Sequence, residues 1–257
     1  MMDKLDAYAE RLDTAAMTAT ATPQISIEDN AFAVDEAYQV QAKSIDRRYT
    51  RGETRIGIKM GLTSRAKMIQ VGVDEVIWGR LTDKMLLEEG GSLAKSKFVH
   101  PRIEPEIVFL MKKELKGNVT ALEAMDAVEA IGPAMEVIDS RYEIFKFALT
   151  DVIADNSSSS GLVIGNWHKP DIDISNLGMR LTVNGQDKMF GSSAAILGHP
   201  VRSLVSAARM VAQSGETLKP GDIVMAGGAT EAHAVSIGET VSLTVQNLGT
   251  ISITVEA

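Results

Sequence analysis

Apolar side chains recur at helical spacing through the first 50 residues of the chain. One set comprises Leu5, Tyr8, Leu12 and Ala15, and a second comprises Val34, Tyr38, Ala42, Ile45 and Tyr49. A spacing of three to four residues places each set on one face of a helix. The segment between them contains Pro23 and a candidate capping box, Ser26 with Asp29. The pattern therefore predicts a helical N-terminal lobe over residues 1–52.

Alternation of apolar and polar residues dominates from residue 53 onward. In residues 55–61 it predicts a strand with Lys59 opposite the apolar face. Residues 133–139 also read as extended. Asn184-Gly185 is a strong hairpin signal, and two alternating runs near the C-terminus flank a turn at residues 247–249.

Three helices are expected within this second part. The first is short, with Thr63 or Ser64 as its cap and Gly72 as its end. The second begins at a capping box of Thr120 and Glu123 and ends at Gly132, and its inward-facing residues are Leu122, Val128 and Ile131. The third begins at Pro200 and ends at Gly215. Helices and strands follow no strict βαβ order. This mixture predicts an α+β fold, with a curled, mostly antiparallel sheet forming a β-rich domain over residues 53–257.

The composition narrows the class of function. The chain has 257 residues, a net charge of −8 and no cysteine. The negative charge argues against nucleic acid and against an anionic membrane surface as partners. Disulfides, thiolate metal sites and cysteine nucleophiles are excluded. Neither a signal peptide nor an apolar run long enough for a membrane span is present, so a cytoplasmic protein that handles a small molecule is expected.

Two glutamates stand two residues apart in the otherwise apolar segment HPRIEPEIVF, residues 100–109. In a strand, Glu104 and Glu106 share one face, where their carboxylates repel each other. Glu136 lies in another extended segment. Three such carboxylates can form an oxygen-rich site for Mg²⁺ or Mn²⁺. The alternative is an edge strand with acids facing water, and Pro105, which has no N–H group to donate, is typical of an edge or an irregular strand end.

Four further segments are candidates for binding or catalysis, each with a plainer alternative. Lys59 is either a catalytic cation or a surface lysine. In the run EVIDSRYEIFKF, Arg141 is a candidate carboxylate clamp with Tyr142 beside it, or the run is an ordinary amphipathic loop. Asn156 and Ser158 belong either to a carboxylate-binding serine loop or to a solvated turn. Gly227 and Gly228 allow a backbone to approach a ligand closely, or form a plain turn.

Together these segments resemble the fumarylacetoacetate hydrolase superfamily. The resemblance is carried by LKPGDIVMAGG at residues 218–228, by GIKMGLTS, and by the E-x-E strand followed some 30 residues later by AMEVIDSR. It runs from about residue 30 to the C-terminus. The nearer branch is that of the 2-hydroxypentadienoate hydratases and the 4-oxalocrotonate decarboxylases, and the segment VIDSRYEIFKFALTDVIADNSSS is more similar to the decarboxylases.

The resemblance implies a set of roles. Glu104, Glu106 and Glu136 become Mg²⁺ ligands, Lys59 becomes the active-site lysine, and Arg141, Tyr142 or the serine run becomes the binder of the distal carboxylate. The implied reaction is Mg²⁺-dependent decarboxylation of 2-oxohex-3-enedioate in the meta-cleavage catabolism of aromatic compounds. A 2-hydroxypenta-2,4-dienoate hydratase and a non-catalytic, dicarboxylate-binding partner subunit are the alternatives. Self-association and a complex with the pathway hydratase are also expected.

Overall fold

The computed structural model describes residues 3–64, 68–69, 75–146 and 148–257. Its centre is an eight-stranded curled sheet with strand order β2-β1-β10-β5-β6-β7-β3, in which β11 also pairs with β5. These strands are β1 (Arg55–Gly61), β2 (Ile77–Thr82), β3 (Leu86–Leu87), β5 (Arg102–Met111), β6 (Val128–Ile138), β7 (Ser159–Ile164), β10 (Ile223–Met225) and β11 (His233–Ala234). The β1–β10 and β3–β7 pairs are parallel and the other pairs are antiparallel.

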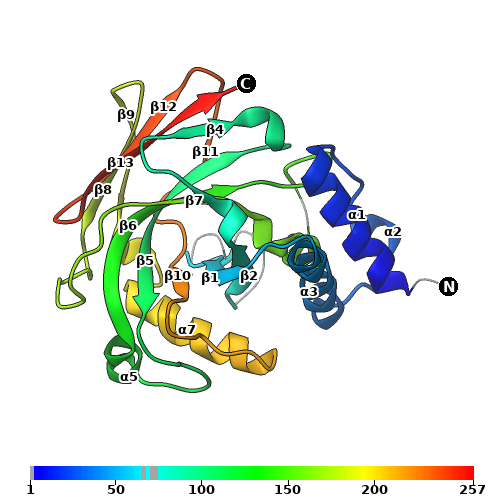
Figure 1. Ribbon diagram of the computed structural model, residues 1–257, viewed down its shortest axis with the longest axis horizontal. Coiled ribbons are helices and arrows are strands. Elements are labelled where there is room, and N and C mark those ends of the chain that lie inside the picture. Colours follow the sequence, from blue (N-terminus) through cyan, green and yellow to red (C-terminus); the bar gives the residue numbers. More distant parts are fainter. Residues whose placement is uncertain (1–2, 65–67, 70–74, 147) are drawn as a thin grey trace.

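A second sheet of five strands packs against the first, at the upper left in Figure 1. Its order is β4-β13-β12-β8-β9, comprising β4 (Ser92–Ala94), β8 (Gly178–Val183), β9 (Gln186–Ser192), β12 (Thr240–Val245) and β13 (Gly249–Glu256). Asn184 and Gly185 adopt the left-handed backbone conformation that a tight β8–β9 hairpin requires, with φ of 51° and 75°. The expected α+β fold with a curled, mostly antiparallel sheet is confirmed.

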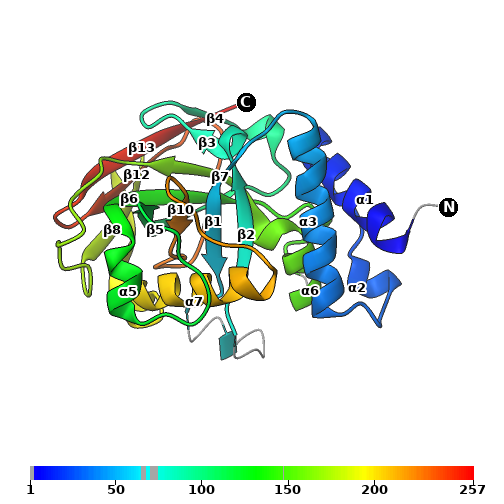
Figure 2. The same cartoon turned by 60° about the horizontal axis from the view of Figure 1, so that its bottom comes forward.

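Helices cover the curled sheet on two sides (Figures 1 and 2). The helices are α1 (Lys4–Thr18), α2 (Ile25–Glu28), α3 (Val34–Thr50), α5 (Ala121–Asp126), α6 (Leu149–Ala154) and α7 (Pro200–Gln213), with 3-10 turns η1 (Asp83–Met85), η2 (Lys95–Lys97), η3 (Asn156–Ser158) and η4 (Ser193–Ala195). In Figure 2, α3 stands between β2 and α1. No helix among the described residues is long and apolar enough to cross a membrane.

The two faces of β5 have different surroundings. Ile103, Ile107 and Phe109 belong to the main apolar core, which includes residues of α7 and of the second sheet. Val108, on the opposite face, packs in a smaller cluster with Ile45 of α3 and Met225 of β10. Because side chains alternate along a strand, Glu104 and Glu106 project from the same face as Val108.

Several local predictions are confirmed. Helices α1 and α3 occur where the apolar spacing placed them. Thr120 caps α5 by accepting a hydrogen bond from the Glu123 N–H group, and Pro200 begins α7. These signals are local, because they depend only on a helix end and its own next turn.

Others are wrong. The helix that begins after Thr120 ends at Asp126 rather than Gly132, and Val128 and Ile131 are buried in β6. Leu122 is 81% exposed rather than facing inward. Ser26 lies inside α2 and bonds to Asp151 instead of forming a capping box. Most of the helix expected between Thr63 and Gly72 lies outside the described residues. The boundary at residue 52 stays a prediction.

Candidate metal centre

Neighbouring strands of the curled sheet bring three glutamates together. In the β5–β6 ladder Glu104 is paired directly with Glu136, and Glu106 follows two residues along β5. One carboxylate oxygen from each of the three lies within 4.8 Å of the others. Glu106 and Glu136 are fully buried, and Glu104 is 8% exposed. The alternative of acids facing water on an edge strand is therefore wrong.

Pro105 does not mark an edge either. Strand β5 lies between β6 and the short strands β10 and β11. Pro105 falls in the gap between those two strands, where its carbonyl oxygen accepts a hydrogen bond from the Ala229 N–H group at 2.9 Å. A residue without an N–H group is tolerated there because no strand on that side requires the donor.

Lys59 reaches the acidic cluster from β1. Its ammonium nitrogen lies 2.9 Å from Oε2 of Glu136, and the side chain is 4% exposed. Lys59 is thus buried and ion-paired, and the surface-lysine alternative is wrong. If all four groups were ionised, three carboxylates and one ammonium would leave a net charge of −2 in a buried site.

Burial controls the protonation of these carboxylates in the metal-free protein. It raises the pKa of Glu106 well above the ordinary value, and the neighbouring negative charge of Glu136 raises it further. Burial also raises the pKa of Glu136, although the Lys59 ammonium partly opposes that shift. Removing a carboxylate from water favours its neutral form unless a cation replaces the lost hydration.

The glycine pair after β10 shapes the same cluster. The Gly227 N–H group donates to Oε2 of Glu106 at 2.8 Å. Gly227 has a φ of +107°, and a Cβ atom there would lie 2.0 Å from Oγ1 of Thr63. A Cβ atom on Gly228 would lie 2.5 Å from Oε2 of Glu104. Only glycines allow the backbone to pass this close to the carboxylates.

The donor set fits a hard divalent cation. Oε1 of Glu106 and Oε1 of Glu136 are buried, and when both groups are ionised no described group donates a hydrogen bond to either atom. Buried polar atoms without partners are uncommon in folded proteins and call for an explanation. An ion such as Mg²⁺ or Mn²⁺ would satisfy these oxygens and balance the charge of −2.

Arg141 and Tyr142, in the segment after β6, bond to the scaffold. The Arg141 guanidinium is buried and bonds to the side chain of Asp155 and to the backbone oxygen of that residue. Tyr142 is fully buried and donates its hydroxyl to the Asp151 carbonyl oxygen at 3.0 Å. Both side chains therefore have partners in the scaffold, and their predicted contact with substrate stays a prediction.

Asn156 and the serines after it form a buried loop rather than a solvated turn. The Asn156 amide accepts from the Arg80 N–H group and donates to the Arg80 carbonyl oxygen, at 2.8 and 2.9 Å. The Ser157 hydroxyl donates to the Trp78 carbonyl oxygen. Ser158 is 5% exposed, and its predicted contact with substrate stays a prediction. Sequence alone could not reveal these bonds, because they join η3 to a strand more than 70 residues away.

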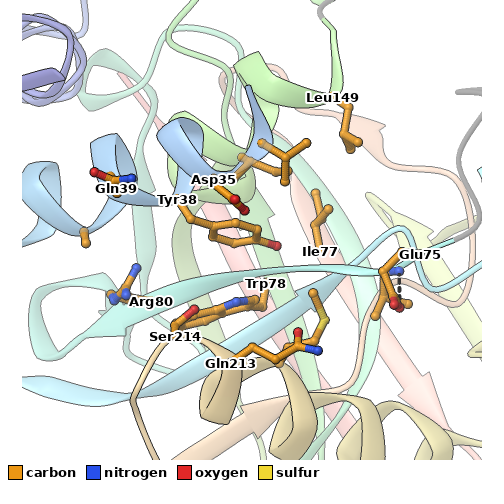
Figure 3. Close-up of a pocket in the computed structure, with 15 residues that line it drawn as sticks. Asp35, Tyr38, Gln39, Glu75, Ile77, Trp78, Arg80, Leu149, Gln213 and Ser214 are labelled. Carbon is orange, nitrogen blue, oxygen red and sulfur yellow. Dashed lines mark hydrogen bonds between the residues drawn. The ribbon is translucent and has the colours of Figure 1, made fainter. Parts of the chain in front are cut away.

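A separate cavity of about 450 Å³ lies between α3, β2 and the C-terminal end of α7 (Figure 3). Tyr38 and Trp78 stack at its wall, with ring centroids 5.9 Å apart. Trp78 and Arg80 alternate with Gly79, which is paired with Lys59, so they project from the opposite face of β2. Neither Lys59 nor any of the three glutamates lines this cavity, so it is not the space around the acidic cluster.

Comparison with known proteins places this geometry in a family. Residues 73–256 match the model of the fumarylacetoacetate (FAA) hydrolase C-terminal domain. The chain belongs to the fumarylacetoacetate hydrolase family. A 4-oxalocrotonate decarboxylase from Pseudomonas sp is 55% identical, over 97% of this chain and 97% of that protein. A 2-hydroxyhexa-2,4-dienoate hydratase from Comamonas testosteroni is 30% identical, over 98% of each chain.

A solved member of this family has nearly the same fold. The structure of 4-oxalocrotonate decarboxylase from Pseudomonas putida G7, complexed with magnesium and adipate, superposes with a TM-score of 0.96. The two chains are 35% identical, and the match covers 99% of each. The resemblance found in the sequence motifs is confirmed.

Proposed function

We propose that the protein is a divalent-metal-dependent decarboxylase. It converts 2-oxohex-3-enedioate to 2-hydroxypenta-2,4-dienoate and CO₂, a step in meta-cleavage catabolism of aromatic compounds. The observation that carries the proposal is the buried cluster of Glu104, Glu106 and Glu136 with Lys59, in a chain that aligns over nearly its full length with a 4-oxalocrotonate decarboxylase. The magnesium and adipate bound by the solved relative further support a site for a metal and a dicarboxylate.

The metal would be held by Glu104, Glu106 and Glu136. When bound, it supplies a Lewis acid that withdraws electron density from an α-keto acid. The electron pair left behind as the distal carboxylate departs as CO₂ can spread through the conjugated double bond to the keto oxygen. Decarboxylation therefore requires positive charge at that end of the substrate.

The protein's own residues also provide positive charge at the keto-acid end of the substrate. Lys59 is the buried cation beside the ligand set, and we assign it the delivery of positive potential or a proton to the keto oxygen. The Gly227 N–H group fixes the orientation of Glu106. Apolar side chains on the same face, including Val108 and Met225, keep water away and thereby strengthen these interactions.

Incubating the purified protein with Mg²⁺ and 2-oxohex-3-enedioate tests the proposed reaction. Release of CO₂ with appearance of the dienol absorbance is expected, and chelation with EDTA should abolish it. The hydratase alternative is supported instead if the protein turns over only 2-hydroxypenta-2,4-dienoate. Neither activity, in a protein that still binds a dicarboxylate, would support the non-catalytic alternative.

The metal site can be tested without turnover. Glu106→Gln replaces a buried carboxyl group whose ionised form is disfavoured by burial, so the metal-free variant should unfold at the same temperature as wild type or a higher one. It should also lose the Mg²⁺-induced rise in melting temperature. Glu129→Gln, an exposed position on the same strand β6 that carries Glu136, is the matched control and should keep that rise. A normal Mg²⁺ response in Glu106→Gln would rule out this ligand set.

Self-association, a complex with the pathway hydratase and a cytoplasmic location belong to the same proposal. They are supported by the family resemblance and by the similarity to the pathway enzymes. Size-exclusion chromatography with light scattering, with and without a purified hydratase, tests both associations.

A further inference from the structure

The proposed substrate has a second carboxylate, and the Arg141 and Tyr142 side chains first expected to bind it have partners in the scaffold. Arg141 is buried against Asp155, and the Tyr142 hydroxyl bonds to the backbone. Lys59 is paired with Glu136 at the metal end of the site. Another cation is needed at a distance from the acidic cluster that matches the length of a six-carbon chain.

Arg102 occupies such a position. The β5–β6 register is regular from Arg102 through Leu110, so Arg102 projects from the same face as Glu104 and Glu106. Two residues along a strand span roughly 6.7 Å, which is comparable to the separation of the two ends of a hexenedioate. Along this face the side chains change from fully buried Glu106 to 8% exposed Glu104 and then to half-buried Arg102. The substrate-accessible end of the cluster therefore points toward Arg102.

The Arg102 guanidinium is held in place but remains available. It lies 3.9 Å from the centre of the Phe145 ring, in the loop after β6. Among the described residues, no hydrogen bond or ion pair involves its guanidinium group. Stacking on an aromatic ring fixes the plane of a guanidinium while leaving its N–H groups at the edge free to bind a carboxylate.

We propose that Arg102, oriented by Phe145, binds the distal carboxylate of the substrate and selects dicarboxylates over monocarboxylates. This inference rests on the proposed decarboxylase function and names the group that recognises the carboxylate to be lost. The hydratase substrate lacks that carboxylate, so Arg102 would favour the decarboxylase substrate at the binding step.

The chemistry predicts how Arg102 divides its effect between binding and rate. The distal carboxylate loses its charge as it leaves as CO₂, so an arginine stabilises the bound substrate at least as much as the transition state. Loss of Arg102 should therefore raise KM strongly and lower kcat little. A residue that only supports the fold would not produce this separation.

Two inhibitors that differ only in the distal carboxylate provide the direct test. 2-Oxohexanedioate and 2-oxohexanoate have the same chain and the same keto-acid end, and their binding to the Mg²⁺-loaded enzyme can be measured by calorimetry. Wild type should bind the dicarboxylate more tightly. In Arg102→Met the dicarboxylate should lose about tenfold or more in affinity, as expected for a charged hydrogen-bonded pair, while the monocarboxylate changes little. An unchanged preference for the dicarboxylate would overturn the proposal.

Further variants keep the result interpretable. Arg102→Lys retains the positive charge and the aliphatic part of the side chain, so it should lose only part of the preference for the dicarboxylate. If Arg102→Met fails to fold, an undiminished preference in Arg102→Lys overturns the proposal. Arg180→Met, at an exposed arginine of β8, is the control and should behave as wild type. This binding assay needs no turnover. An absence of CO₂ release in wild type would refute the proposed function. The role of Arg102 is decided separately, by whether the preference for the dicarboxylate is lost when Arg102 is replaced.

Discussion

The ammonium group of Lys59 lies 2.9 Å from a carboxylate oxygen of Glu136, and both side chains are buried. This pair partly neutralises a cluster that would otherwise place three negative charges in an apolar interior. Lys59 therefore stabilises the metal-free protein and, in the proposed mechanism, remains beside the reacting keto acid once a metal takes over the charge balance.

Replacing Lys59 with methionine should separate catalysis from metal binding. The variant retains all three carboxylates, so its Mg²⁺ affinity, measured by thermal shift or calorimetry, should change by only a few-fold. Its kcat should fall by about 10²–10⁴, the usual contribution of a positioned acid or base. Lys113→Met, at an exposed lysine, is the control. Unchanged turnover in Lys59→Met would show that this lysine has no part in the reaction.

A single methyl group at Gly228 should disturb a metal ligand. The added Cβ would lie 2.5 Å from Oε2 of Glu104, so that carboxylate must move. We expect Gly228→Ala to weaken Mg²⁺ binding at least tenfold, about 1.4 kcal/mol, as judged by calorimetry. At Gly178 the nearest atom would be 3.6 Å from a new Cβ, so Gly178→Ala is the matched control. Equal Mg²⁺ affinity in the two variants would contradict this placement.

Tyr142→Phe should affect stability and leave the reaction unaltered. The lost hydroxyl donates to the Asp151 carbonyl oxygen in the scaffold, so urea unfolding should show a loss of about 1 kcal/mol. The kcat is expected to stay within twofold of wild type. A large fall in kcat would instead give the hydroxyl the catalytic role that the sequence suggested.

Asp155 should make stability depend on pH. Burial raises its pKa from 3.8 to about 6, against the opposing effect of Arg141. Between these two values the unfolded chain loses a proton that the folded protein keeps, so the contribution of this group to the free energy of unfolding falls as pH rises. The full effect is about 3 kcal/mol, of which about 2 kcal/mol falls between pH 4 and 6.

The comparison with Asp155→Asn isolates this effect from the other carboxylates. The stability difference between wild type and the variant, from urea unfolding at each pH, should shift by that amount in favour of the variant as pH rises from 4 to 6. Asp171→Asn, an exposed position, should show no such trend. A difference that is constant, or that grows in favour of wild type, would contradict the raised pKa.

The sequence predicted those features whose signals are local. The pattern correctly placed the helix cap at Thr120, the helix start at Pro200 and the hairpin at Asn184-Gly185, because each depends on nearby residues. The acidic cluster could be predicted because two carboxylates that share one face of an apolar strand repel each other, and a bound cation removes that repulsion. Arg102 escaped notice because a lone arginine at a strand start is unremarkable until the register shows which face it occupies.

The errors arose where tertiary contacts override local pattern. The extended interpretation of residues 133–139 was right, but β6 begins at Val128 because pairing with β5 extends it toward α5. The ion pair between Arg141 and Asp155 could not be predicted either, because only the chain path brings these two residues together. Of the two interpretations of the serine run, the solvated turn is wrong: Ser157, Ser158 and Ser159 are buried because η3 lies against β2.

Three consecutive residues, Asn156, Ser157 and Ser158, have positive φ values of 50°, 51° and 63°. Such conformations cost about 1–2 kcal/mol each in non-glycine residues. In return, the Asn156 amide bonds to both backbone groups of Arg80, much as a neighbouring strand would, on a strand that otherwise ends the sheet. The loop thus covers an edge to which another polypeptide could add a strand. The strained backbone of these three residues therefore protects the protein against aggregation through that edge.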